Sequence, residues 1–225
     1  MRIRDIKKSA RASLKGYWGT GVLITFLMFL IVGVVPQIFE GVVSGGFQNP
    51  HLYTEPIELL YSLLLVPFTV GTTWFYIALV RSEQPGVSDI FKNYQNLRFS
   101  GKLIWTYFLV GLFTVLWLLL FLVPGIIKSL AYSQTFYLLK DHPEYTATQA
   151  ITESRRLMKG SKGHYFLLNL SFIGWAILAT FLLFIGLLWV LPYLSASQSV
   201  FYNELIRTDE DMVLPVDPTD PQPLV

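Results

Sequence analysis

The chain has 225 residues, of which 53% are hydrophobic and 14% are charged, and its mean hydropathy is +0.50. Soluble domains carry about a quarter charged residues, so this composition excludes an ordinary soluble globule and indicates a protein of the lipid bilayer. The formal net charge is only +2, with basic residues clustered in particular loops and acidic residues in the C-terminal tail. This clustering indicates membrane orientation and argues against a nucleic-acid partner. The absence of cysteine excludes disulfides, thiolate metal sites and cysteine nucleophiles.

A basic segment, residues 2–15, opens the chain. Its apolar and basic residues fall on opposite faces of a helix: Ile3, Ile6, Ala10 and Leu14 against Arg2, Arg4, Lys7, Lys8, Arg11 and Lys15. The pattern predicts an amphipathic helix that lies on anionic lipid headgroups. An apolar stretch, residues 20–38, follows and is predicted as the first membrane span. A signal peptide is the competing interpretation, but no clear small-x-small cleavage site follows the apolar run.

Two further spans are predicted at residues 57–80 and 103–123, and the latter consists of 21 consecutive uncharged residues. The connection of residues 40–56 is polar, rich in glycine and free of Lys and Arg, which is typical of the outer side of a membrane. The connection of residues 81–102 carries four basic residues and contains a short amphipathic piece. It is therefore expected on the inner side.

The predicted fourth span, residues 126–139, is short. Its 14 residues cover roughly 21 Å at about 1.5 Å each, against a hydrocarbon core of about 30 Å. Pro124 and Gly125 are expected to break the preceding helix, after which the segment either crosses, with Lys128 at the outer interface, or is re-entrant. If it crosses, sixteen of the seventeen Lys and Arg residues lie inside, and if it does not, ten do. The positive-inside rule favours the crossing.

Residues 165–183 and 186–206 are predicted as the fifth and sixth spans, joined by a tight turn at residues 184–185. The six spans are expected to form a single transmembrane domain, residues 1–207, with both chain termini in the cytoplasm. The tail, residues 208–225, combines five acidic residues with four prolines. It is predicted to be disordered in the cytoplasm, because such a composition cannot bury a core.

The spans are predicted to form three hairpins of one kind, each entered through a basic segment. Aromatic pairs recur at corresponding places in the three returning spans: Phe75-Tyr76, Phe136-Tyr137 and Phe201-Tyr202. Three short segments correspond just before the entering spans: Leu14-Lys15-Gly16, Leu97-Arg98-Phe99 and Met158-Lys159-Gly160. These matches in register indicate internal repetition. Because polar groups in lipid need partners, the more polar second, fourth and sixth spans are expected at the centre of the bundle.

Enzyme signatures are not found in the sequence. It has no phosphate-binding Gly-rich loop and no HExxH motif, and its three histidines, His51, His142 and His164, are scattered. We therefore expect no enzymatic activity, no metal site and no cofactor. No Asp, Glu, Lys, Arg or His lies near the middle of a predicted span, which argues against proton- or ion-coupled transport.

Two groups of residues are candidates for binding. The first is basic and is expected to bind anionic headgroups or a partner membrane protein: Arg11, Lys15, Lys128, Arg155, Arg156, Lys159 and Lys162. For Lys128 simple snorkelling to the interface is the alternative, and for the other residues a role in setting topology. The second group lies in the polar returning spans: Thr72, Tyr132, Ser133, Gln134, Tyr193, Ser197 and Gln198. These side chains either bond neighbouring helices or line a narrow cavity beside the prolines of those spans.

Several motifs are similar to those of a known family: Leu157-Met158-Lys159-Gly160, the run from Leu168 to Trp175, Pro192-Tyr193, Phe201-Tyr202, and upstream Pro124-Gly125-Ile126 and Tyr132-Ser133. The chain resembles the bacterial integral-membrane family catalogued as domain of unknown function 975, found mostly in Gram-positive bacteria. Its aliphatic turn at residues 181–185 departs from the family, which has more Thr and Gly there. The resemblance implies a bacterial plasma-membrane location and carries over no activity, substrate or catalytic residue.

Together these features predict an all-α polytopic membrane bundle of six transmembrane helices, arranged as three hairpin repeats with basic interfacial helices. The expected function is that of a non-enzymatic accessory or scaffold factor that binds anionic lipid or a partner membrane protein. The alternative is a transporter or carrier that moves an uncharged or amphipathic small molecule or lipid through the central polar spans.

Overall fold

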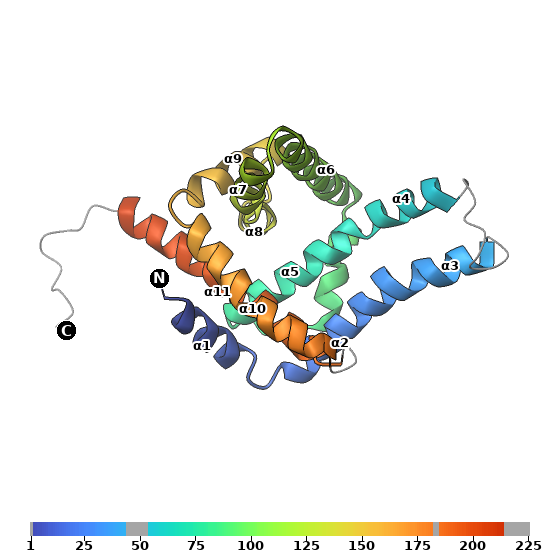
Figure 1. Cartoon of the computed structure of the whole chain (residues 1–225), viewed down its shortest axis with the longest axis horizontal. Helices are drawn as coiled ribbons and strands as arrows, with labels where there is room; N and C mark the ends of the chain where they lie inside the picture. Colours follow the sequence, from blue (N-terminus) through green and yellow to red (C-terminus); the bar gives the residue numbers. More distant parts are fainter. Residues whose placement is uncertain (1, 44–53, 182–184, 214–225) are drawn as a thin grey trace, which may run out of the picture.

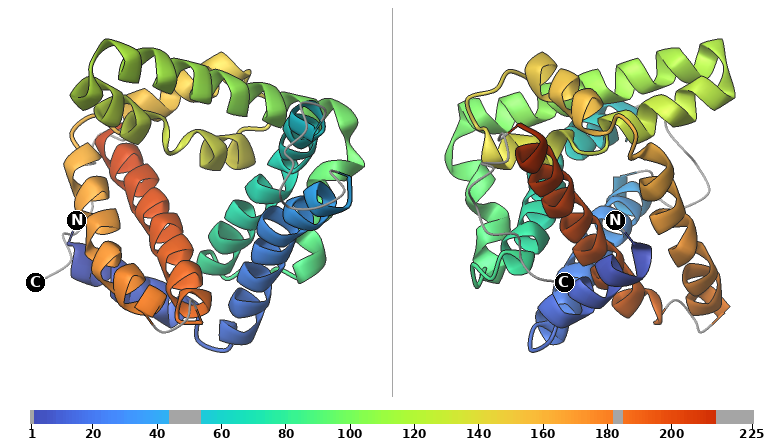
Figure 2. Two further views of the ribbon diagram at one scale, coloured as in Figure 1. Left: turned by 45° about the vertical axis from the view of Figure 1, so that its right-hand side comes forward. Right: turned by 90° about the vertical axis from the view of Figure 1, so that its left-hand side faces the viewer.

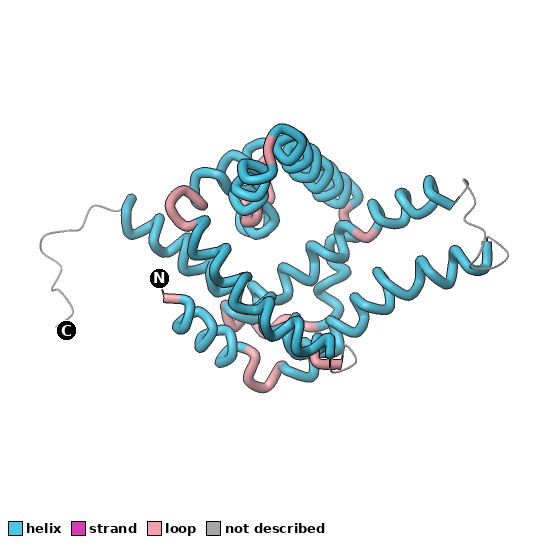
Figure 3. Tube along the Cα trace, in the orientation of Figure 1, coloured by secondary structure: helices cyan, strands magenta, loops and turns pink. Residues whose placement is uncertain are grey.

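The computed structural model describes residues 2–43, 54–181 and 185–213, and all regular structure in these ranges is helical (Figure 3). The predicted all-α class is confirmed. The elements are, in chain order, α1 (Ile3–Ser13), α2 (Trp18–Met28), η1 (Phe29–Val34), α3 (Val35–Val43), α4 (Thr54–Leu64), α5 (Val66–Val80), η2 (Val87–Gln95), α6 (Leu97–Leu120), α7 (Leu122–Tyr132), α8 (Thr135–Asp141), α9 (Ala147–Leu157), α10 (Lys162–Phe181) and α11 (Leu187–Val213). The element η1 is a π-helix and η2 is a 3₁₀-helix.

Four helices in the described ranges are long and apolar enough to cross a membrane: Trp18–Phe39, Ile57–Val80, Leu97–Leu120 and Lys162–Thr180. They correspond to the first, second, third and fifth predicted spans. The predicted fourth span is divided between α7 and α8, and the predicted sixth lies in α11, which contains Pro192 and several polar residues. The count of six spans therefore stays a prediction.

The helices form three groups that lie along the sides of a triangle (Figure 1; left view of Figure 2). In the first group α3 packs against α4, in the second α7 folds back onto α6, and in the third α10 packs against α11. Inside, α5 packs against both α8 and α11. The helices α8 and α11 are also in contact, because Tyr137 of α8 stacks on Tyr202 of α11 with ring centroids 5.0 Å apart.

The core follows the returning segments, as the polarity of the sequence predicts. In the most apolar window of Ile57–Val80, 61% of the residues are buried, against 11%, 17% and 22% for Trp18–Phe39, Leu97–Leu120 and Lys162–Thr180. The bulkiest fully buried side chains include Phe75 and Tyr202. The three entering helices are thus left with apolar outer faces, which is the arrangement expected where lipid and not water covers the protein.

Three amphipathic helices each pack on a returning segment. The basic N-terminal segment forms α1, as predicted, and lies against α11, where the Tyr193 hydroxyl donates to the Lys7 carbonyl over 3.1 Å. The 3₁₀-helix η2 lies on α5, and the amide of Asn93 donates to the Pro67 carbonyl over 3.0 Å. The third, α9, lies on α8 and the end of α7, where the Ser154 hydroxyl donates to Ala131.

Two of the three corresponding entry segments share one local structure. Gly16 in the turn after α1 has φ +89° and Gly160 in the turn after α9 has φ +87°, a left-handed conformation that glycine adopts without steric cost. Leu14 and Met158, two residues before these glycines, are both fully buried. The third segment differs, because Leu97 opens α6 directly and is 83% exposed.

The helix boundary after the third predicted span differs from the expectation. The helix α6 ends at Leu120, and Phe121 is extended with φ −158°, so the break precedes Pro124 and Gly125. Pro124 lies in the first turn of α7, where its missing N–H costs nothing. Gly125 instead permits close packing, because a Cβ built there would lie 2.8 Å from the Leu118 Cα.

The C-terminal helix also extends beyond its predicted end. Residues 208–213 belong to α11, whereas the sequence predicted disorder from residue 208. The Thr208 hydroxyl donates to the Glu204 carbonyl over 2.8 Å, and Asp209 forms an ion pair with Arg156 of α9. The remaining predicted tail, residues 214–225, lies outside the described residues, as do residues 44–53 of the predicted outer connection and the first residue of the turn at residues 184–185.

Gly71 tests the packing of η2 on α5. A Cβ at this position would lie 2.1 Å from the Ile90 carbonyl oxygen, so we expect Gly71→Ala to push η2 away from α5. Overpacking of this kind costs about 1–3 kcal/mol, which would lower the melting temperature of the detergent-purified protein by several degrees. Gly101→Ala is the matched control, because nothing lies within 4 Å of a Cβ there and alanine favours the helix. Equal melting temperatures for the two variants would contradict the packing.

Candidate functional site

The N-terminal helix α1 separates an apolar stripe from a basic face. Its stripe is buried, with Ile6 3% exposed and both Ala10 and Leu14 fully buried, because it packs against α11 and α10. Burial of this stripe fixes the rotation of the helix. The basic residues are consequently turned away from the core: Arg4, Lys8, Arg11 and Lys15 are exposed and Lys7 is half-buried.

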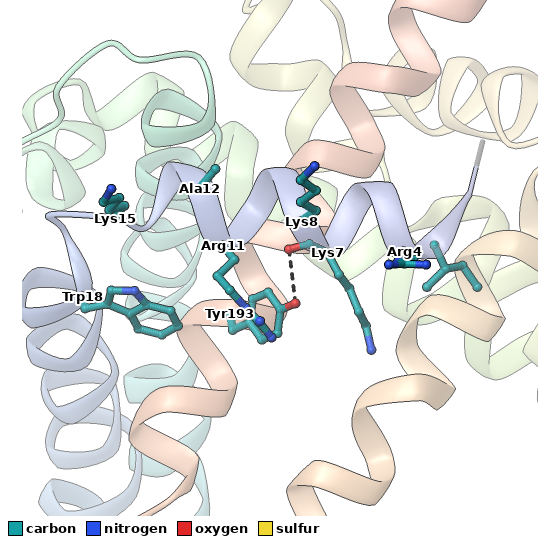
Figure 4. A pocket seen from close by; sticks show the side chains of 9 residues that line it. Arg4, Lys7, Lys8, Arg11, Ala12, Lys15, Trp18 and Tyr193 are labelled. Atoms are coloured by element: carbon teal, nitrogen blue, oxygen red, sulfur yellow. Dashed lines mark hydrogen bonds between the residues drawn. The ribbon is translucent and has the colours of Figure 1, made fainter.

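An open pocket of about 830 Å³ lies along this basic face, bounded by Trp18 at the start of α2 and Tyr193 of α11 (Figure 4). Nine residues line it: Ile3, Arg4, Lys7, Lys8, Arg11, Ala12, Lys15, Trp18 and Tyr193. We call it the α1 pocket. It unites Arg11 and Lys15 of the first predicted group with Tyr193 of the second.

Aromatic rings hold two of the cations in place. The Lys7 ammonium lies 4.2 Å from the Phe172 ring centroid and donates to the Ser171 carbonyl over 3.3 Å. The Arg11 guanidinium lies 5.2 Å from the centroid of Tyr193, whose hydroxyl is fixed by the Lys7 carbonyl. Such cation–π contacts orient a charge without neutralising it.

The α1 pocket is strongly electropositive. Five of its nine lining residues are cationic, and none of the nine is acidic. Partial burial, and then the charge of Arg11, lower the pKa of Lys7. The acidic residue of α1, Asp5, instead lines a neighbouring pocket with Arg2, Glu204 and Arg207. Mutual repulsion of the cations makes an anion the favoured occupant, and phosphate oxygens suit both ammonium and guanidinium donors.

The family comparison covers almost the whole of this architecture. The family model described as "Protein of unknown function (DUF975)" matches residues 1–131 and 118–209. The chain belongs to this family. The first matched segment contains α1, and the second contains Tyr193 and the helices on which α1 packs. Comparisons with curated proteins and with solved structures give no match. Membership of the DUF975 family thus supplies no activity, and function has to be argued from the site.

The predicted basic residues of α9 have different surroundings from one another. Arg156 makes two hydrogen bonds to Asp209, of 2.8 and 2.7 Å, and a third to Glu153. The hydrogen bonds to Asp209, then to Glu153, raise the pKa of Arg156. It therefore ties α9 to α11, although it is exposed, as Arg155 and Lys159 also are.

Lys128 lies near the basic end of α9. Its ammonium is 4.4 Å from the Trp117 ring centroid, and it is within electrostatic range of Arg155 and Lys162. The predicted crossing of residues 126–139 separates Lys128 from those two residues by the thickness of the membrane. The structure brings the three together because α9 folds back onto α7, where Ser154 donates to the Ala131 carbonyl.

The predicted polar group does not form one cavity. Thr72 lines an apolar cleft and Tyr193 the α1 pocket, while Gln134 and Ser197 are fully buried. Ser133, Ser197 and Thr72 donate to carbonyls of their own helices, three or four residues earlier. Gln198 bridges two helices by donating to the Asn169 side chain over 2.8 Å, and Tyr132 packs against Phe113. These contacts are those of helix packing, and the carrier hypothesis stays a prediction from the sequence.

The histidines of the described ranges stand apart from any cluster of metal ligands. His142 lies 3.1 Å from a carboxylate oxygen of Glu144 and stacks on Tyr145, and His164 is exposed. His51 lies outside the described residues. Where the structure describes the chain, no three or more His, Asp or Glu residues are grouped so that they hold a metal ion.

Sequence reasoning missed an ionic junction at the ends of the three returning segments. Arg81, directly after α5, donates twice to Asp141 of α8, over 2.6 and 2.8 Å, and once to Asn203 of α11. Tyr202 of α11 donates to the same Asp141 carboxylate over 2.7 Å. The charges of Arg81 and Asp141, each just beyond an aromatic pair of the repeat, were the available signal in the sequence.

The pKa values follow from this geometry. Burial acts to raise the pKa of Asp141, but the hydrogen bonds from Arg81 and Tyr202 and the positive charges nearby outweigh it and lower the pKa. The hydrogen bond to Asp141 is the main cause of the raised pKa of Arg81. The side chains remain 29% and 21% exposed, so solvent screens part of their attraction.

Asp141→Asn tests this junction through its pH dependence. A carboxyl with a lowered pKa stabilises the fold above its unfolded value of about 3.9 and loses that contribution as the pH falls further. We expect the variant to be about 1–2 kcal/mol less stable at pH 7, with the deficit in melting temperature shrinking below about pH 4. Adding Arg81→Gln to Asp141→Asn should cost little more, because the pair is already broken. A deficit that persists unchanged at pH 3 would refute the ionic role.

Proposed function

We propose that this protein is an integral membrane protein without enzymatic activity that binds anionic lipid headgroups at the α1 pocket. In this role it acts as an accessory or scaffold factor. The observation that carries the proposal is the set of five cations, without a carboxylate, among nine lining residues. Near an anionic membrane surface each basic residue contributes about 1 kcal/mol. Trp18 and Tyr193 beside them are of the types that anchor proteins at the membrane–water interface.

The exposed basic residues at the end of α9 and in the turn after it extend this proposal. Arg155 lies in α9 and Lys159 in the turn that follows, and Lys162 and Lys128 lie close by. We propose that this second basic surface takes an anionic headgroup or the acidic segment of a partner membrane protein. Arg156 serves it indirectly, by holding α9 against α11 through Asp209.

For the architecture we propose six spans as three hairpin repeats. The packing of α1 on α11, of η2 on α5 and of α9 on α8 supports this, because each amphipathic helix contacts the returning segment that precedes its own hairpin. The helix α1 has no returning segment before it in the chain and packs instead on α11, the last returning segment. The three amphipathic helices therefore connect the three hairpins in a closed ring. The shared left-handed glycines Gly16 and Gly160 add local support.

For location we propose the plasma membrane of a bacterium, with both termini in the cytoplasm. The family resemblance motivates the organism, and the basic residues motivate the orientation. The six-span assignment puts sixteen of the seventeen Lys and Arg residues on the inner side, which is the distribution that sets topology. Lys128, the seventeenth, is assigned to the outer side although it lies near Arg155 and Lys162, so whether the fourth segment crosses is the part of the topology that most needs a test.

Binding at the α1 pocket is tested with the triple variant Lys8→Gln, Arg11→Gln and Lys15→Gln. The purified protein, in a neutral detergent, is titrated with a short-chain fluorescent phosphatidylglycerol. Losing three cations, each worth about 1 kcal/mol near anionic lipid, should weaken binding at least about tenfold. Binding of the wild-type protein should also weaken as salt concentration rises.

A matched triple variant controls for net charge. Lys92→Gln, Arg98→Gln and Arg207→Gln removes three exposed cations that do not line the α1 pocket. We expect this variant to bind phosphatidylglycerol nearly as tightly as the wild-type protein does. If both triple variants lose affinity equally, the attraction is a property of the whole protein and the α1 pocket is not the site.

The six-span topology is tested with single cysteines, because the chain has none of its own. Ser88→Cys and Ser161→Cys are expected inside, and Ile185→Cys outside. A membrane-impermeant maleimide added to intact cells should therefore label only Ile185→Cys, whereas all three should react after the cells are opened. Labelling of Ser161→Cys in intact cells would mean that the fourth segment does not cross.

A further inference from the structure

A second cavity opens on the other side of α11 from Tyr193. The helices α2 and α11 cross tightly where a Cβ on Gly21 would lie 3.0 Å from the Pro192 Cβ, and Tyr76 of α5 reaches the Gly21 carbonyl. Beyond this crossing, a cleft of about 590 Å³ lies between α2, η1, α5 and the start of α11. Its volume is in the range of ligand-binding pockets.

The lining of this cleft is almost entirely apolar. Fourteen residues line it, none of them charged, and nine are aliphatic, Met or Phe. The hydroxyls of Thr25 and Thr72 donate to the carbonyls of Gly21 and Thr69 over 3.0 and 2.7 Å. The Tyr76 hydroxyl donates to the Gly21 carbonyl over 3.4 Å. These three donors are engaged, and of the other lining side chains only Ser195 adds a hydroxyl. A polar occupant would therefore replace few of the hydrogen bonds that it makes with water, whereas a hydrocarbon loses none.

One wall of the cleft is a π-helix. Phe29, Val32 and Gly33 of η1 line it, next to the flexible Met28 of α2. π-Helices are rare and occur frequently at functional sites. Gly33 leaves space on this wall, since a Cβ there would meet only the Phe29 ring, at 3.8 Å.

The mouth of the cleft is apolar and faces outward. Phe29 is 60% exposed and Ile185 is 58% exposed, while Phe26 and Leu191 also lie at the rim. The η1 side belongs to Trp18–Phe39, a helix long and apolar enough to span a membrane. If Trp18–Phe39 spans the membrane, the mouth of the cleft beside η1 faces the hydrocarbon tails of the lipids. In contrast, Thr72 at the inner end is only 8% exposed.

From these features we propose that the cleft binds one hydrocarbon chain of a membrane lipid, which enters laterally between η1 and the start of α11 and reaches Thr72 and Tyr76. The site requires no particular headgroup. It is therefore independent of anion binding at the α1 pocket, and either site can fail experimentally without the other.

The test uses full-length protein in bilayer nanodiscs that contain a phosphatidylcholine with a photoreactive diazirine in one acyl chain. After irradiation, cross-linked peptides are mapped by mass spectrometry. We expect adducts at Thr72 or Tyr76, which lipid surrounding the protein cannot reach from outside. Gly33→Phe should fill the cleft and reduce these inner adducts at least about fourfold, the factor expected from one lost methylene contact.

Gly111→Phe is the matched control, because Gly111 is an exposed glycine of α6 with nothing within 4 Å of a built Cβ. It should leave the inner adducts unchanged. Ser195→Leu fills the cleft from α11 and serves as a second test if Gly33→Phe fails to give a monodisperse protein. Adducts confined to the rim residues Phe26 and Phe29, or inner adducts that survive both cleft-filling variants, would overturn the proposal.

Discussion

Arg81 and Asp141 join the ends of α5 and α8 by two hydrogen bonds, and Tyr202 of α11 donates to the same carboxylate. Further along the same three segments, Tyr137 stacks on Tyr202 and the Trp74 indole donates to the Phe136 carbonyl over 2.8 Å. Removing these partners would leave the half-buried carboxylate of Asp141 without compensation for its charge, which costs free energy. The interactions therefore hold the three segments in one relative position. Every other helix packs on one of these segments or on a helix that does.

This junction decides where the amphipathic helices lie. Gly71 lets η2 approach α5 to within backbone contact, and the buried stripe of α1 lies on α11. Once the stripe of α1 is buried, its cations have to project from the opposite side. The α1 pocket is thus a consequence of core packing: Tyr193 and Phe172, which orient Arg11 and Lys7, come from the two helices on which α1 rests.

The two cavities suit the two chemical parts of a lipid. The α1 pocket offers five cations with interfacial aromatic residues, and the cleft beside η1 offers an uncharged lining and a mouth that faces outward. They lie on different sides of α11, and the cleft begins beside the crossing of Gly21 and Pro192. A protein with both sites would hold lipids at defined positions, which fits an accessory or scaffold role within a membrane and requires no catalytic group.

Local pattern determined much of this protein. Four of the apolar spans, the amphipathic α1 and the central place of the polar returning segments follow from spacing and composition within single segments, so the sequence alone predicted them. The sequence also showed that the segments ending at Gly16 and Gly160 correspond, but not that both glycines are left-handed. Tertiary structure decided the rest, because it depends on contacts between distant segments. Lys7 meets Ser171, Arg156 extends α11 by holding Asp209, and Lys128 joins Arg155 only after α9 folds onto α7. The periodicity of apolar residues within one helix predicts which face is buried, but it does not predict which distant side chain will contact that face.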